Sequence, residues 1–520
     1  MNLLLIQIQI VTLVNNLRLT KRDFVKYSTG LLSAAVLPYP YQAALANDHW
    51  DVIVVGGGTA GLPAAIFAAK RGLKVLVIEK ASVIGGTLFV STGQISGAGT
   101  VFQERKGIKD SPDQHYEDIM RINNNSSDPI LTRVLVDNAG PTINWLAKNG
   151  YTIFENHPVK KMAHDAFSVA RYQQGPKGTT SPWGGGIAIL NVLKPLVEQE
   201  ISKGSITVLL ETGANDLIQS PDGKIKGVVV ENKQGKILEY RSEKVILASG
   251  GCASNPRLYE ELHGVPLYCQ MAYPQSQGAG LILGQSVGGY LRGGEKYSPL
   301  YGMILSDDKV PSTPYGVARN VMERLPWEIL VNSAGKRFVK EDHESIDYIE
   351  HRIGEQPAHR HWTILDQRML DEMPEIIYDW PNKRIMDESN NHVMFKSANS
   401  IRDLAIKTGL HPMNLESTIE EYNNNLNNNR ADTLGRQHRP LPLEKGPFYS
   451  IRMSGWSLCS FAGLGVNGNF EVTKPSGEPI KNLYAIGEVI GFGATSGNAY
   501  VNGMGVTPAL TYGKLLGERI

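Results

Sequence analysis

The stretch WDVIVVGGGTAGLPAAIFAAKRGLKVLVIEKA, residues 50–81, predicts the start of a dinucleotide-binding fold. Residues 52–55 form an apolar run typical of a buried parallel strand, and an alanine-rich segment typical of a helix follows. Residues 75–78 form a second apolar run, and a glycine-rich turn joins the first run to the helix. Strand, turn, helix and strand therefore arrive in the order that a nucleotide-binding unit requires.

Three glycines and one acid give this unit its chemistry. Gly56 permits the tight turn, Gly58 lets the backbone approach a pyrophosphate, and Gly61 allows close packing of helix on strand. The helix N-terminus then offers free N–H groups to the anion. Glu79 ends the second strand, where its carboxylate can accept hydrogen bonds from ribose hydroxyls. A carboxylate disfavours a 2′-phosphate, so the sequence indicates FAD or NAD rather than NADP.

Three distant segments favour FAD, because a long cofactor requires the chain to return to it. These segments are VIGGT (83–87), SEKVILASGG (242–251) and IKNLYAIGEV (480–489), of which the last two are strands running into glycine. A glycine-rich stretch near the end of the chain leads into a last helix, whose N-terminus can face the reduced flavin. The expected cofactor-binding residues are Gly56, Gly58, Thr59, Ala60, Gly61, Glu79, Lys80, Gly86, Thr87, Ala214, Gly250, Gly251, Glu488, Gly505 and Val506.

The rest of the chain predicts an α/β protein with an inserted domain. Residues 205–251 alternate apolar runs with turn signals, which is typical of a β-meander beside a nucleotide-binding sheet. Residues 291–447 are rich in proline and charge and carry no nucleotide signal. We therefore expect a two-dinucleotide-binding FAD domain, formed by residues 47–290 and 448–520, with an α+β cap domain at 291–447.

The first 46 residues are expected to be an export signal. Lys21-Arg22 precedes a short apolar stretch, and Ala44-Leu45-Ala46 has the form of a cleavage site. The order Thr-Lys-Arg-Asp-Phe resembles a twin-arginine signal with lysine in place of the first arginine, which predicts an exported, periplasmic protein. An ordinary secretory signal or a plain N-terminal extension stays open. The apolar stretch is too short to span a bilayer.

Charge and cysteine content narrow the classes of partner. The net charge of +1 provides no field that would attract nucleic acid or an anionic membrane. Cys252, Cys269 and Cys459 lie far apart, without the spacing of a zinc site, a haem attachment site or an iron–sulfur site. We therefore expect no metal, a small-molecule substrate, and an electron donor or acceptor outside this chain.

These motifs, in this order, resemble the fumarate reductase/succinate dehydrogenase flavoprotein superfamily, which also contains the 3-ketosteroid dehydrogenases and urocanate reductases. The resemblance covers nearly all of residues 48–520. It implies an FAD-dependent enzyme acting on CH–CH bonds, with substrate held between a mobile cap and the flavin. It also implies non-covalent FAD, because GGTLFVSTG (85–93) lacks the histidine that succinate dehydrogenases place there for the flavin bond.

The chain departs from fumarate reductases at their substrate-binding positions. SLCSFAGLGVN (457–467) carries Cys459 and Ser460 around the family's histidine positions, Ser345 falls where a proton-donating arginine stands, and Tyr500 replaces a terminal arginine. A buried dicarboxylate without these cations would be costly. The sequence thus favours an uncharged substrate.

The resemblance is closest to the ketosteroid dehydrogenases at Tyr500. In that branch a tyrosine hydroxyl and a glycine N–H polarise a substrate ketone, and here the glycine is Gly503 or Gly505. An FAD-dependent dehydrogenase or reductase of a C=C bond next to the carbonyl of a cyclic ketone is therefore expected. A packed aromatic role for Tyr500, a reductase of an unsaturated acid, and a non-catalytic flavin-binding electron carrier remain alternatives.

A ketone substrate also needs a base for its α-proton. The segment EDHESIDYIEH (341–351) offers Tyr348, His343 and Asp342, and the first resembles the family's cap tyrosine in approximate position. Tyr172 is a further candidate hydroxyl for the wall of the site. The sequence does not choose among them.

Overall fold

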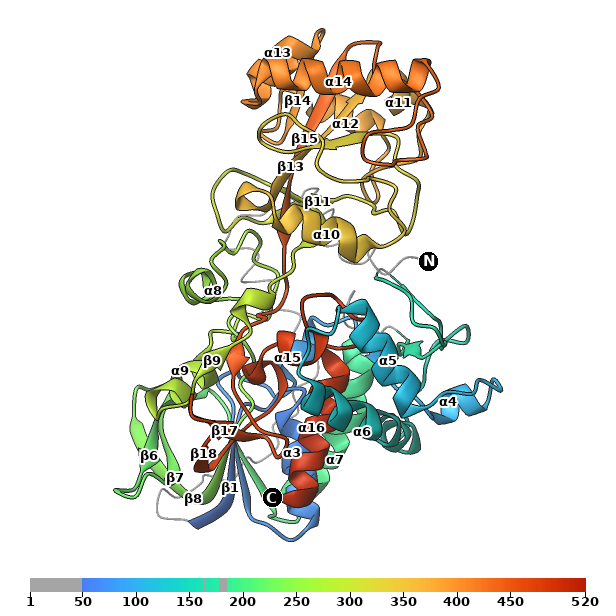
Figure 1. Ribbon diagram of the computed structural model, residues 1–520. Coiled ribbons are helices and arrows are strands. Elements are labelled where there is room, and N and C mark those ends of the chain that lie inside the picture. Colours follow the sequence, from blue (N-terminus) through green and yellow to red (C-terminus); the bar gives the residue numbers. More distant parts are fainter. Residues whose placement is uncertain (1–48, 163, 177–184) are drawn as a thin grey trace.

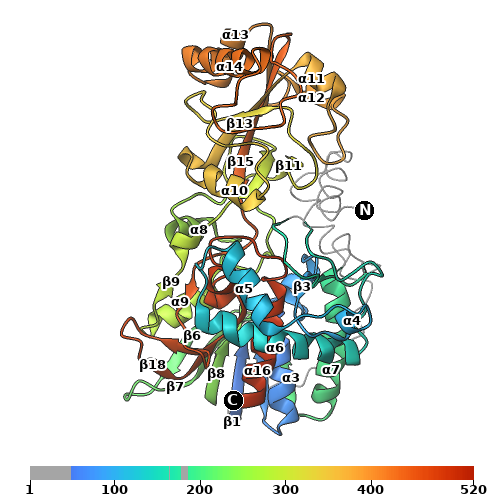
Figure 2. The same ribbon diagram turned by 45° about the vertical axis from the view of Figure 1, so that its right-hand side comes forward.

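The computed structural model describes residues 49–162, 164–176 and 185–520, which form two bodies stacked one above the other (Figure 1). The lower body contains the N-terminal strand and the last helix, and the upper body contains residues from the middle of the chain. A view turned by 45° shows the same separation (Figure 2). The expected export signal at residues 1–46 lies outside the described residues.

The lower body is built on an eight-stranded sheet whose central strands are parallel. The main path has the order β17-β18-β8-β1-β2-β5, and β1 pairs with both β2 and β8 in parallel register. The predicted meander is the antiparallel run β6-β7-β8. The strands are β1 (His49–Val55), β2 (Val75–Ile78), β5 (Ile206–Leu209), β6 (Thr212–Gln219), β7 (Ile225–Asn232), β8 (Ile237–Leu247), β17 (Glu471–Thr473) and β18 (Pro479–Ala485).

Helices cover this sheet, and the N-termini of two of them lie close together. Helix α3 (Gly61–Lys70) follows the glycine-rich turn, and α16 (Val506–Arg519) packs on it through glycines. A Cβ at Gly513 would lie 2.2 Å from the Ala60 carbonyl oxygen, which shows how closely the two backbones approach. The remaining elements of this body are η1 (Gly86–Phe89), α4 (Val101–Glu104), α5 (Pro112–Ile122), α6 (Pro129–Lys148), α7 (Gly185–Ser202), α8 (Pro256–His263), α9 (Ala279–Ser286), η4 (Gly487–Ile490) and α15 (Gly493–Ser496).

The upper body, called the cap, is built on a six-stranded antiparallel sheet with its own hydrophobic core. The strands are β10 (Leu300–Leu305), β11 (Pro314–Val317), β12 (Ile329–Val331), β13 (Arg360–Asp366), β14 (Phe395–Ala398) and β15 (Phe448–Trp456). The helices are α10 (Ile346–Gly354), η3 (Pro357–His359), α11 (Gln367–Glu372), α12 (Lys383–Glu388), α13 (Ile401–Thr408) and α14 (Pro412–Asn427). Helix α10 lies on the underside of the cap, facing the lower body (Figures 1 and 2).

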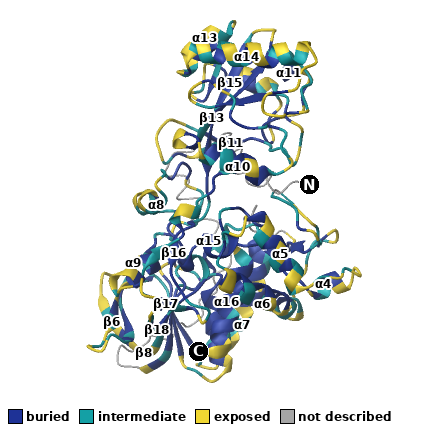
Figure 3. Ribbon diagram, viewed as in Figure 1, coloured by how far each residue is buried: buried dark blue, intermediate teal, exposed yellow. Residues whose placement is uncertain are grey.

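The cap boundaries differ from those expected. Strand β15, placed in the FAD domain by the boundary at residue 448, pairs with β10, β13 and β14 in the cap sheet. Tyr268 and Cys269 already belong to the cap core. The backbone of Cys269 also pairs with that of Ser312 in an isolated parallel β-bridge. The buried strands of the two bodies remain distinct in Figure 3. Short two-stranded ladders complete the fold: β3 (Ile95–Ser96) with β4 (Tyr172–Gln173), and β9 (Leu291–Arg292), just before η2 (Gly294–Lys296), with β16 (Gly463–Leu464).

Across residues 49–162, 164–176 and 185–520, every helix is too short or too polar to traverse a bilayer.

Close packing at the glycine-rich turn gives a stability prediction. A Cβ at Gly61 would lie 1.9 Å from the Gly56 carbonyl oxygen, so Gly61→Ala should force the turn and α3 apart and destabilise the apoprotein by about 1–3 kcal/mol. A Cβ at Gly58 meets nothing nearer than the Gly86 Cα at 3.7 Å, so Gly58→Ala is the matched control. Urea unfolding of both apoproteins would measure the difference, and equal stabilities would contradict the packing argument.

Candidate functional site

A cavity of about 330 Å³ lies where the turn after β1, the end of β2, η1 and the start of α16 converge. It brings together most residues expected to hold the cofactor, although they come from distant parts of the chain. Those lining it are Gly56, Gly58, Thr59, Ala60, Glu79, Lys80, Gly86, Thr87, Ala214, Gly250, Glu488, Gly505 and Val506.

Gly61 and Gly251, the other two expected contacts, lie behind the cavity wall and act through packing. Gly61 allows α3 to leave the turn closely, as described above. A Cβ at Gly251 would lie 1.9 Å from the Ser460 Oγ and 2.4 Å from the Glu488 Oε1. Both glycines therefore shape the cavity without lining it.

Glu79 is held at one end of the cavity by backbone hydrogen bonds. The Gly57 N–H donates to its Oε2 at 2.8 Å and the Ala81 N–H donates to its Oε1 at 2.7 Å. Burial raises the pKa of this carboxyl, and the two N–H groups act in the opposite direction. Each oxygen keeps a further lone pair, so the carboxylate can also accept from a ribose hydroxyl in the cavity.

Two helix N-termini supply the groups that an elongated anionic cofactor requires. Helices α3 and α16 begin after Ala60 and Gly505, both of which line the cavity, and no described side chain caps either end. Leu62 and Thr507 donate to the Gly58 and Gly503 carbonyls, and Pro63 and Pro508 carry no N–H. The N–H groups of Gly61 and Val506 are therefore the ones that remain for an anion in the first three residues of each helix. The open space beside Gly58, where a Cβ would fit, admits close approach of a pyrophosphate. This donor set fits FAD.

The end of the cavity around Cys459 is mostly apolar, and the one acid of its described lining, Glu488, accepts from the Ser460 N–H at 2.8 Å and has a pKa raised by burial. Leu458, Cys459, Phe492 and Thr495 line it. Among the described lining residues, Lys80 is the only cation, and it follows Glu79 directly in the chain at the other end. A dianionic substrate would therefore meet no positive charge from the described lining at this end.

Tyr500 lies one layer behind this apolar end. Its ring packs against Phe492 with centroids 5.3 Å apart, and its hydroxyl lies 2.6 Å from the Ser457 Oγ. Ser457 donates to the Cys459 carbonyl at 2.9 Å, which leaves its oxygen to accept from Tyr500. Burial raises the pKa of the Tyr500 phenol well above its usual range, so it stays a donor at physiological pH.

Further hydroxyls surround Tyr500. The buried Tyr259 and the partly buried Tyr297 interact electrostatically with its phenol, as does the Cys459 thiol. Burial raises the pKa of both tyrosines and of the thiol, so the whole group is neutral. The Tyr259 hydroxyl has no hydrogen-bond partner among the described residues. Three phenols and Ser457 thus form a neutral hydroxyl cluster next to the apolar end of the cavity.

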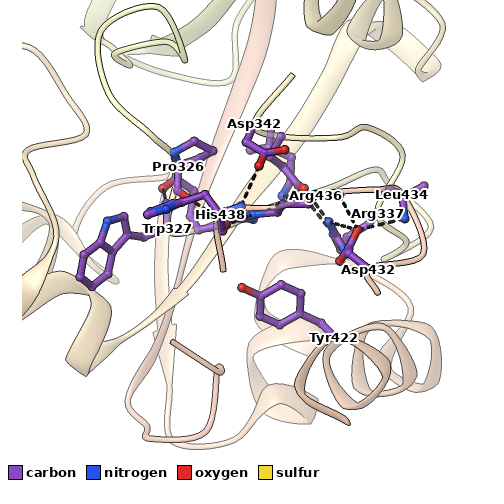
Figure 4. A network of polar contacts seen from close by, with 12 residues as sticks. Pro326, Trp327, Arg337, Asp342, Tyr422, Asp432, Leu434, Arg436 and His438 are labelled. Carbon is purple, nitrogen blue, oxygen red and sulfur yellow. Dashed lines mark hydrogen bonds and ion pairs between the residues drawn. The ribbon is translucent and has the colours of Figure 1, made fainter. Parts of the chain in front are cut away.

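The three candidate bases lie outside the cavity lining. Tyr348 is 38% exposed and stacks on His343 with ring centroids 4.0 Å apart. Asp342 belongs to a polar network inside the cap, where its Oδ2 accepts from the Gln437 and His438 N–H groups at 2.7 Å each (Figure 4). The structure therefore assigns Asp342 a structural contact and leaves Tyr348 and His343 at the surface.

Gly503 and Tyr172 also lie behind the wall. Gly503 has a φ of +83°, and a Cβ there would lie 2.5 Å from the Ser96 Oγ, so this glycine packs the loop against β3. Tyr172 is fully buried in β4, with its ring 5.5 Å from that of His157. Gly505, the alternative to Gly503, does line the cavity.

Two buried acids on α10 were not among the residues predicted from the sequence. Asp347 and Glu350 flank Tyr348 in the segment 341–351, and they face inward where Tyr348 faces solvent. Isoleucines at 346, 349 and 353 mark the buried face of this helix. Their spacing would have placed Glu350 on that face, but Asp347, one residue after Ile346, lies off it and carries no such signal.

Comparison with known proteins identifies the fold and its cofactor. A sequence profile of the FAD binding domain family matches residues 51–505. The chain is 28% identical to the NADH:fumarate oxidoreductase of Klebsiella pneumoniae over 91% of its own length, but spans about half (48%) of that enzyme. It is also 28% identical to the fumarate reductase (cytochrome) of Shewanella frigidimarina, over 92% of this chain and 78% of that one.

A solved structure of similar fold is the 3-ketosteroid-Δ4-(5α)-dehydrogenase of Rhodococcus jostii in complex with 4-androstene-3,17-dione. It superposes with a TM-score of 0.66 at 23% identity, covering 92% of this chain and 98% of that one. The expected FAD-domain architecture is therefore confirmed.

Glu79 gives a test of the cofactor site. Glu79→Gln keeps the size of the side chain but replaces one acceptor oxygen by a donor, so one of the two backbone N–H groups and a ribose hydroxyl lose their partner. Loss of a charged acceptor costs about 1.5–3 kcal/mol, or about 10- to 150-fold in the FAD dissociation constant. Flavin fluorescence titration of the apoprotein measures it. The exposed Glu239→Gln should bind FAD normally, and an equal affinity for both variants would exclude the proposed contact.

Proposed function

This chain belongs to the FAD binding domain family, and on that premise we propose that it introduces or reduces a C=C bond next to the carbonyl of an uncharged, cyclic ketone. FAD supplies hydride transfer when bound. We propose that it is held without a covalent bond, since residues 85–93 contain no histidine. The remaining tasks, which are to orient the ketone and stabilise charge on its oxygen, fall to this chain.

The observation that carries the proposal is the neutral hydroxyl cluster beside the apolar end of the cavity. Tyr500, Ser457, Tyr259 and Tyr297 offer hydrogen bonds without charge. Such donors stabilise an oxyanion that develops during reaction better than they bind a neutral carbonyl. A substrate carboxylate, by contrast, would be buried there without a cation from the described lining.

Tyr500 is the donor best placed for this role. In the present arrangement its proton is directed at Ser457, whose own proton goes to the Cys459 carbonyl. A ketone oxygen reaching Tyr500 would take over this donation without leaving Ser457 buried and unsatisfied. In dehydrogenation a base would take the proton of the α-carbon while hydride from the β-carbon would pass to FAD, and both transfers would reverse in the direction of reduction.

A second candidate is reduction of an unsaturated acid. The fumarate reductases named above share 28% identity with this chain, which favours related chemistry. We propose, further, that electrons pass to or from a partner outside this chain, and that residues 1–46 direct export to the periplasm.

An anaerobic comparison of substrates separates the two candidates. FAD-loaded protein with reduced viologen should reduce a cyclic enone such as cyclohexenone or a 3-keto-4-ene steroid, and the same ligands should perturb the flavin spectrum. Fumarate and urocanate should do neither, because they would bury a carboxylate. Turnover of the acids with no response to any enone would replace the proposal by the second candidate.

Tyr500→Phe tests the oxyanion donor. It removes the hydroxyl and keeps the ring packed on Phe492, so turnover should fall about 10²- to 10³-fold while ketone affinity changes little. Ser457→Ala should have a smaller effect, because Tyr500 would keep its own proton for the substrate.

The matched control is Tyr449→Phe, which removes a phenol that contacts Gln367 in the cap at 2.6 Å. It should leave turnover near that of the wild type. If Tyr500→Phe behaves like this control while binding FAD normally, Tyr500 is a packing residue.

A further inference from the structure

Helix α10 carries two buried acids. Asp347 is 3% exposed and Glu350 is 2% exposed. The helix lies on the underside of the cap (Figures 1 and 2), and its isoleucines pack into the cap's own core. Carboxyl groups are rarely buried this fully unless they are paired.

Asp347 contacts the loop that carries Tyr500, residues 497–502, and Glu350 lies beside Asp347 within the cap. The Tyr500 N–H donates to the Asp347 Oδ1 at 3.3 Å, and the His351 Nε2 lies 2.6 Å from the Asn498 carbonyl oxygen. A third acid, Asp165 of the lower body, accepts from the N–H of Ile346 at the start of α10 at 3.1 Å. Three polar contacts thus join the cap helix to the lower body, and two of them use a carboxylate oxygen.

Each buried acid has an oxygen left over. The Asp347 Oδ2 and the Glu350 Oε2 lack a hydrogen-bond partner within the described part of the chain, while the Glu350 Oε1 accepts from the Tyr301 N–H at 3.0 Å. No ion pair between described residues neutralises Asp165, Asp347 or Glu350. An unpaired buried carboxylate oxygen is costly when charged and much less so as a carboxylic acid.

The surroundings also favour the protonated form. Burial and the neighbouring Asp165 raise the pKa of Asp347 well above its usual range, and burial and Asp347 do the same for Glu350. His164 stacks on Tyr500, but burial lowers its pKa to about 4, so it is neutral. Tyr297, Tyr301 and Tyr500 are neutral phenols, and the His351 ring contacts the Asn498 carbonyl.

We propose that Asp347 is a proton-dependent positioning residue, which holds helix α10 on the Tyr500 loop while protonated and releases it on ionisation, and that a charge on the neighbouring Glu350 favours release through repulsion of Asp347 and Asp165. Two or three negative charges in this junction would repel one another and require water. Separation of α10 from residue 165 and from the loop would supply that water. Closure of the cap would then take up protons, whatever substrate the enzyme uses.

The direction of the pH dependence follows from the raised pKa values. The docked state binds more protons than the separated state, in which the acids titrate near their ordinary values. Docking is therefore complete at low pH and weakens as pH rises through the docked-state pKa values, by up to about tenfold per pH unit for each carboxyl.

Small-angle X-ray scattering of the FAD-loaded protein between pH 5 and 9 tests this device. The radius of gyration of the wild type should increase with pH as the cap separates. The double variant Asp347→Asn/Glu350→Gln keeps the acceptor oxygens but cannot ionise, so it should stay compact throughout. Glu344→Gln, an exposed acid just before the same helix, should follow the wild type.

Far-UV circular dichroism and bound flavin establish that each variant is folded. If the double variant does not fold, Glu350→Gln alone should reduce the steepness of the pH dependence by about half, because one of two protons is removed. A wild-type radius that is constant over the range, or the same pH dependence in wild type and amide variant, would overturn the proposal.

Discussion

The arrangement of the cofactor site depends on backbone packing at Gly61. With no side chain there, the Gly56 carbonyl lies so near that a Cβ would be 1.9 Å away, and α3 starts directly at the cavity. Gly513 then brings α16 onto the Ala60 carbonyl. Two uncapped helix starts consequently face one space, and their partial positive charges add. We expect α3 to face the phosphates of a bound FAD and α16 to face its flavin, although the two helices are far apart in the chain.

The two ends of the cavity differ in charge because they serve different chemistry. At the first end Glu79 is buried as an acceptor, fixed by two backbone N–H groups and followed by Lys80. At the second end the described lining has no cation, burial raises the pKa of its one acid, Glu488, and the donors behind it are phenols and a serine. Even the acids near Tyr500 are in an environment that favours their neutral form. Such surroundings suit a ketone whose charge appears only during reaction.

The FAD domain could be predicted because its signals are local: Gly56, Gly58 and Gly61 specify the turn within one strand–helix unit. The cap boundary could not, since β15 is an apolar run that suits either sheet, and its pairing with β13 is a long-range choice. In α10, the isoleucine spacing indicates that Glu350 is buried, whereas Asp347 lies off the isoleucine face and is buried at its contact with the lower body. The contact of Asp347 with Tyr500 spans 153 residues and has no local signal.

A carboxyl at position 347 meets two demands that other side chains would not. A leucine would fill the space but leave the Tyr500 N–H buried without its acceptor, at a cost of about 1–3 kcal/mol. An amide would keep the acceptor and would be indifferent to pH. A carboxylic acid accepts a hydrogen bond from that N–H while neutral, and its ionisation would favour separation of α10 from the Tyr500 loop. Glu350 meets the same demands within the cap, where it accepts from the Tyr301 N–H, so of these two acids it is Asp347 whose described contact joins the cap to the lower body.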